Sequence, residues 1–83
     1  MDKDALAVAR ERARWHSRRG LLELDLLLEK FLATQLEQMD EERLALYDQV
    51  LLLPDNELLD IAMGRKPPPD DRTGAIIALL RAL

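Results

Sequence analysis

The chain has 83 residues, of which 48% are hydrophobic and 34% are charged, and its formal net charge is −4. A chain of this length has room for one hydrophobic core, so a second domain is excluded. Its balance of apolar and charged residues excludes a disordered tail. It contains no cysteine, which excludes a disulfide framework, a thiolate metal site and a cysteine nucleophile.

Targeting and membrane segments are not evident in the sequence. No apolar run approaches the ~20 residues that span a bilayer, and the N-terminus lacks the apolar core of a secretory signal. Asp2, Asp4 and Glu11 are acidic residues of the kind that a mitochondrial presequence avoids. We therefore expect a bacterial cytoplasmic protein without direct membrane insertion.

The first predicted helix covers residues 3–19. Asp2 or Asp4 can cap its free amides, and Gly20 is expected to end it, because glycine adopts the left-handed conformation common at helix ends. One narrow stripe is expected to face the core, and it consists of Ala5, Val8, Ala9, Arg12, Ala13 and Trp15 or His16.

The second predicted helix covers residues 21–39 and is rich in leucine. Its main apolar face consists of Leu24, Leu27, Leu28, Phe31, Leu32 and Leu36. Leu21, Leu22 and Leu26 widen that face, so neighbouring helices should cover this one on more than one side. We place it at the centre of the bundle, and we expect all three aromatic residues in the core: Trp15, Phe31 and Tyr47.

Three shorter helices are predicted over residues 41–53, 56–63 and 70–82. Asp40 is the expected N-cap of the first, which Pro54 ends, and Asp55 or Asn56 is the expected cap of the next, which Gly64 ends. A stiff run of three prolines, residues 67–69, precedes the last helix. The leucine-rich composition, without β-branched runs, favours packed helices. The sequence therefore predicts a small all-α, five-helix bundle that forms a single domain over residues 1–83.

The junction between the first two helices is the most informative stretch for function. It reads Trp15-His16-Ser17-Arg18-Arg19-Gly20-Leu21-Leu22-Glu23-Leu24-Asp25. Helix-end electrostatics alone account for much of it, because arginines complement a helix C-terminus and acids complement the next N-terminus. Conventional catalytic groups are sparse here, since the chain has one histidine and adjacent helical residues such as His16 and Ser17 point in different directions.

The run Arg-Arg-Gly-x-x-Glu-Leu-Asp, preceded by a tryptophan, resembles the motif of the succinate dehydrogenase assembly factors, small five-helix proteins that promote covalent flavin attachment. The resemblance extends over most of the chain, through Phe31, Asp40-Glu41-Glu42, Tyr47 and the run at Asp55, Glu57 and Leu58. It is weaker in the fourth helix, where Ile61 and Ala62 stand in place of a common Trp-Leu pair.

The resemblance implies a function in which this chain is a helper and not an enzyme. It would bind the flavoprotein subunit of succinate dehydrogenase or fumarate reductase and assist attachment of FAD to a histidine of that subunit. The motif assigns partner binding to Arg18, Arg19, Gly20, Glu23 and Asp25. FAD is then the client's cofactor. We expect no stable flavin site, catalytic residue or metal site in this chain, and a monomer when it is free.

Two other classes of function remain open from the residues alone. One is a regulatory protein-binding module, such as an antitoxin-like or cytoskeleton-binding protein, that uses the same junction. The other is a nucleic-acid-binding helix pair, because residues 1–19 carry an excess of bases. The acidic residues that dominate positions 20–60 disfavour it, since they repel phosphate.

Overall fold

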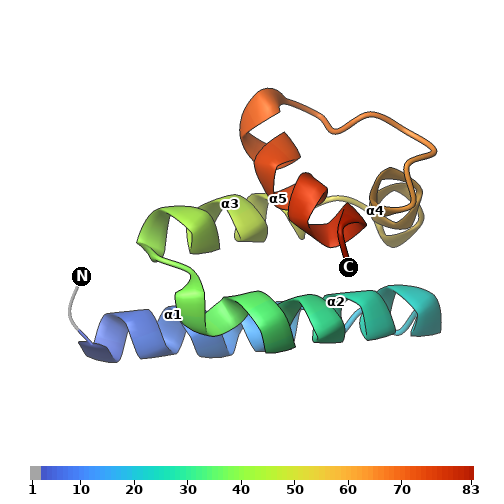
Figure 1. The fold of residues 1–83 in the computed structure, drawn as a ribbon. Helices are drawn as coiled ribbons and strands as arrows, with labels where there is room; N and C mark the ends of the chain where they lie inside the picture. The colour runs from blue at the N-terminus through green and yellow to red at the C-terminus, as the bar shows by residue number, and fades with distance from the viewer. Residues whose placement is uncertain (1–2) are drawn as a thin grey trace.

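The computed structural model describes residues 3–83 and contains no strand within them. Its elements are α1 (Lys3–His16), α2 (Leu22–Gln35), a short 3₁₀ turn η1 (Leu36–Gln38), α3 (Glu41–Val50), α4 (Asp55–Ala62) and α5 (Asp71–Arg81). The prediction of an all-α fold with five helices is confirmed, and Figure 1 shows their order along the chain.

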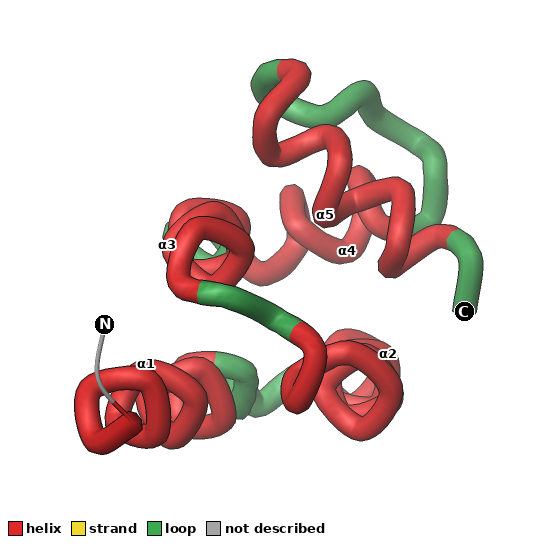
Figure 2. Tube along the Cα trace, turned by 60° about the vertical axis from the view of Figure 1, so that its left-hand side comes forward, coloured by secondary structure: helices red, strands yellow, loops and turns green. Residues whose placement is uncertain are grey.

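The helices form two layers. α1 and α2 run antiparallel side by side in one layer, and α3, α4 and α5 lie over them (Figures 1 and 2). Figure 2 looks along α1 and α2 and shows α3 over α1, with α4 and α5 over α2. Accordingly, α1 packs mainly against α3, while α2 packs against α4 and α5.

The predicted central position of the second helix is wrong. Leu22 and Leu26 of α2 are exposed, so this helix is covered on one face only. The central position belongs instead to α3, which packs against both α1 and α5. The leucines of α2 spread over more than one side of the helix, but too few elements exist in a chain this short to cover all of them.

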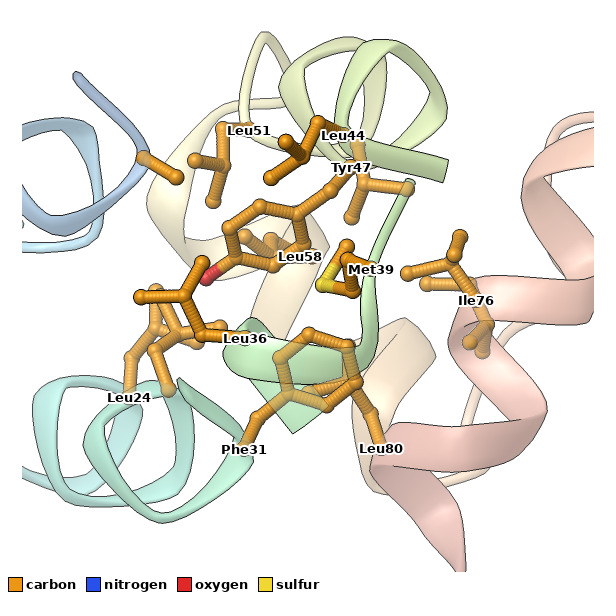
Figure 3. Close-up of a cluster of buried hydrophobic side chains, with 14 of the residues drawn as sticks. Leu24, Phe31, Leu36, Met39, Leu44, Tyr47, Leu51, Leu58, Ile76 and Leu80 are labelled. Atoms are coloured by element: carbon orange, nitrogen blue, oxygen red, sulfur yellow. The ribbon is translucent and has the colours of Figure 1, made fainter. Parts of the chain in front are cut away.

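The core is one cluster of side chains from all five helices (Figure 3). Phe31 of α2 and Tyr47 of α3 are fully buried at its centre, where their rings stack with centroids 5.1 Å apart. The Tyr47 hydroxyl lies 2.6 Å from Ser17 Oγ, and Ser17 Oγ in turn donates to the carbonyl of Ala13. Because the single Ser17 hydroxyl hydrogen goes to Ala13, Tyr47 is the donor in their bond. This chain of bonds fastens the end of α1 to α3.

The buried stripe of α1 agrees with the prediction in part, because Ala9 and Ala13 face the core as expected whereas Val8 and Arg12 are exposed. Ala13 and Ser17 are buried and Leu6 and Ala9 pack against the core, as a helix with inward positions at intervals of three and four residues requires. Trp15, predicted to be a core aromatic, projects from the opposite side of α1 and is 69% exposed.

Several helix ends also differ from the predicted ranges. α1 ends at His16 and not at residue 19, because residues 18–21 form the loop described below. The second predicted range divides into α2 and η1. It ends at Gln38, one residue short of the prediction, because Met39 is extended. α3 ends at Val50, three residues short of the prediction, because the residue before a proline avoids helical backbone angles.

The caps of the later helices follow the predicted chemistry in part. Asp40 caps α3 by accepting from the amide of Arg43 at 2.9 Å, as predicted. Pro54, and not Asp55 or Asn56, holds the N-cap position of α4. Gly64, with φ of 82°, follows the end of α4. The predicted cap at Asp2 lies outside the described residues, and nothing is described of the Asp4 side chain.

Candidate protein-binding site

The loop between α1 and α2 is held by a carboxylate from the helix that follows it. Asp25 Oδ1 accepts from the Arg19 amide at 2.7 Å, and Oδ2 accepts from the Gly20 amide at 3.2 Å. Gly20 has φ of 82°, a conformation that L side chains rarely adopt. A Cβ at Gly20 would meet nothing within 4 Å, so the glycine is needed for its backbone angle and leaves open space above it.

The Arg19 side chain is turned into its own protein. Its Nε donates to Asp55 Oδ1 at 2.8 Å, Nη1 to the carbonyl of Leu51 at 2.7 Å, and Nη2 to the carbonyl of Leu53 at 3.1 Å. Only 19% of this side chain is exposed. Arg19 therefore ties the α1–α2 loop to the α3–α4 turn. Arg19, to which the motif assigns partner binding, thus uses its guanidinium within its own protein.

Arg18 and Glu23 differ from Arg19 in being exposed. Among the described residues, neither makes a hydrogen bond or an ion pair with another side chain. Glu23 precedes Asp25 by two residues, so it lies on nearly the opposite side of α2. The structure thus divides the five predicted residues: Arg19 and Asp25 hold the loop, while Arg18 and Gly20 are accessible on it and Glu23 is accessible in the first turn of α2.

Exposed apolar side chains surround this loop, and the sequence reasoning missed them as surface residues. Trp15 precedes the loop by three residues, and Leu22, which is 71% exposed, begins α2. Leu52 is 83% exposed, and in the sequence it stands between Leu51 and Leu53, whose carbonyls bind Arg19. Large exposed apolar side chains beside accessible charges are typical of a surface that binds another protein. Leu22 could have been found from its place off the main stripe of α2; nothing marks Leu52.

A groove of about 830 Å³ runs between α1 and α2 from this loop toward η1. Basic residues line its α1 side and acidic residues line its α2 side, with apolar side chains between them. The lining consists of Arg14, Ser17, Arg18, Gly20, Asp25, Glu29, Leu32, Ala33, Leu36 and Glu37. Three of the five predicted site residues, Arg18, Gly20 and Asp25, therefore share one concave surface.

The described residues offer few groups for catalysis or metal binding. His16 is exposed, and within residues 3–83 no cluster of three or more histidine and carboxylate side chains could hold a metal ion. None of the described helices is both long and apolar enough to cross a membrane. The accessible loop, its apolar surroundings and the groove define a small helical domain suited to binding another protein.

Comparison with known proteins identifies the family. The family described as "Flavinator of succinate dehydrogenase" matches residues 11–83, and the chain belongs to it. The FAD assembly factor SdhE of Ralstonia nicotianae is 36% identical over 80 residues, covering 89% of this chain and 82% of that protein. The SdhE of Legionella pneumophila strain Paris is 43% identical over 61 residues, covering 71% and 77%. The mitochondrial succinate dehydrogenase assembly factor 2 of Aedes aegypti is 40% identical, covering 94% and 50%. The predicted family is confirmed.

Proposed function

We propose that this chain is an assembly factor that binds the flavoprotein subunit of succinate dehydrogenase, or of fumarate reductase, and promotes covalent attachment of FAD to that subunit. Family membership supports the general role. The observation that carries the assignment of the site is the loop itself. Asp25 and Arg19 fix it from within, while Arg18 on the loop and Glu23 in the adjoining first turn of α2 are exposed without a partner among the described residues.

The mechanism we propose needs no reacting group from this chain. A rigid loop loses little conformational entropy on binding, so Arg18 and Glu23 can be presented at low cost to charged groups of the client. Charge-assisted hydrogen bonds of this kind contribute roughly 1.5–3 kcal/mol each when partly desolvated. The bound client would hold its own histidine and flavin in reactive geometry, which can lower a barrier by several kcal/mol.

The proposal also covers the state of the free protein. The free protein is a cytoplasmic monomer without stably bound flavin, and FAD stays with the client. Nucleic-acid binding loses support, because Asp25, Glu29 and Glu37 line the same groove as the exposed arginines and would repel a phosphate backbone.

The test is covalent flavin on the client, measured by in-gel fluorescence in cells that lack this protein. Complementation with wild type should restore the signal, and Glu23→Ala or Arg18→Ala should reduce it at least about tenfold if each removes one charge-assisted bond. Glu41→Ala is the matched control for Glu23, since Glu41 occupies the first turn of α3 as Glu23 occupies that of α2. If deletion leaves flavinylation unchanged, the proposed function is wrong.

Trp15 provides a second prediction for the same surface. Because it is exposed, Trp15→Ala should change the free energy of unfolding by less than about 0.5 kcal/mol. If Trp15 packs against the client, the same change should weaken binding about tenfold or more. As the single tryptophan of the chain, it can be labelled as 5-fluorotryptophan and followed by one ¹⁹F resonance. That resonance should shift when flavoprotein is added; an unmoved resonance in the complex would place Trp15 outside the interface.

A further inference from the structure

The groove between α1 and α2 has walls of opposite charge. Arg14 and Arg18 lie on the α1 side, while Asp25 and Glu29 lie on the α2 side. Arg14 is engaged, since its guanidinium is 2.9 Å from Glu11 and 3.8 Å from Glu37. Within the described chain Arg18 and Glu29 have no such partner. The groove thus offers one unpaired base and one unpaired acid.

The groove exists because large side chains do not close the space between the two helices. α1 packs down onto α3 and α2 onto α4 and α5, so the facing sides of the pair remain free. Small Ala33 lies exposed on the α2 side, and with half-buried Leu32 it supplies apolar surface at the end of the groove farthest from the loop, where the buried Leu36 forms the floor. This apolar end is distinct from the loop at residues 18–21.

The lining favours a peptide as occupant over a nucleotide. Asp25, Glu29 and Glu37 would repel the phosphates of a free flavin nucleotide. A polypeptide segment can instead carry both signs of charge and an apolar side chain. The groove is also continuous with the proposed binding loop, because Arg18 and Gly20 belong to both.

We propose that this groove receives one segment of the client flavoprotein, with an acidic side chain toward Arg18, a basic side chain toward Glu29 and an apolar side chain over Leu32 and Ala33. The proposal rests on the proposed function and extends it from the loop along α2. Opposite charges on the two walls fix the direction in which the segment lies, since the reversed direction would bring like charges together.

The decisive variant fills the groove at the end away from the loop. Ala33→Arg should weaken binding of the purified flavoprotein at least about tenfold by calorimetry. Ala45→Arg is the matched control, because Ala45 is also an exposed alanine within a helix, on α3, and it should bind as wild type does. Glu29→Lys should weaken binding as well. Circular dichroism melting of each variant establishes that it is folded.

A photo-crosslinking residue at position 33 identifies the segment directly. Its crosslinks should fall on one flavoprotein peptide that contains both an acidic and a basic residue, while the same group at position 45 should give none. The groove proposal is overturned if wild type binds and Glu23→Ala weakens binding, yet Ala33→Arg and Glu29→Lys bind normally; the proposed function then still stands. If wild type does not bind the flavoprotein, it is the proposed function that fails.

Discussion

Arg19→Ala is expected to lower the free energy of unfolding by about 2–4 kcal/mol, because it breaks a part-buried ion pair and leaves the carbonyls that Arg19 binds without their donor. The side chain donates to Asp55, the first residue of α4, to the carbonyls of Leu51 and Leu53 in the turn before it, and to the carbonyl of His16. Chemical denaturation of wild type and variant measures the loss. Arg19→Lys should recover only part of the lost stability, since an ammonium lacks the planar fork with which the guanidinium reaches these acceptors.

The same variant separates a positioning role from a contact role. If Arg19 acts by holding the loop, flavinylation should fall with Arg19→Ala at 37 °C and return at a low temperature where the variant is folded. Asp55→Ala should behave in the same way, because it removes the other half of the ion pair. Glu23→Ala, in contrast, should stay defective at every temperature. A folded Arg19→Ala protein that still fails to support flavinylation would show that Arg19 contacts the client itself.

Local rules predicted the fold well where one residue determines the outcome. The spacing of Leu24, Leu28 and Phe31 places them in the core as expected, and Asp40 caps α3 with the predicted bond. Such features depend on helical periodicity or on a side chain three residues away. The positive φ of Gly20 was also predictable from the conformational freedom of glycine, although α1 ends at His16 and Gly20 lies in the loop that follows.

The roles of Arg19 and Trp15 could not be derived from spacing. Arg19 bonds to residues 32 to 36 positions away in the chain, a distance over which no local pattern carries information. The usual burial of aromatic residues predicts Trp15 in the core, but its angle on α1 relative to Ala13 and Ser17 directs it outward. The partner helix decides which side of a helix faces the core. In α1 that partner is α3, and packing against it buries Ala13 and Ser17 and leaves Trp15 outside.

Tyr47 carries the other large expected effect on stability. Tyr47→Ala should cost about 3–5 kcal/mol, because it empties a fully buried site against Phe31. Tyr47→Phe retains the ring and loses only the bond to Ser17, so its cost should be about 0.5–1.5 kcal/mol. Urea denaturation of the two variants measures the difference. Equal costs would mean that the hydroxyl, and not the ring, fastens α1 to α3.

The Tyr47 hydroxyl also predicts how stability changes at high pH. Burial raises the pKa of Tyr47 from 10.0 to about 12, against a smaller opposing effect of the Arg19 charge. Above pH 10 the unfolded chain loses this proton while the folded chain keeps it, so stability should fall between pH 10 and pH 12, by about 1.4 kcal/mol at pH 11. Tyr47 is the single tyrosine of the chain, so Tyr47→Phe should remove this part of the loss. A wild-type protein and a Tyr47→Phe variant that lose the same stability from pH 9 to pH 11 would show that the hydroxyl titrates normally and is open to water.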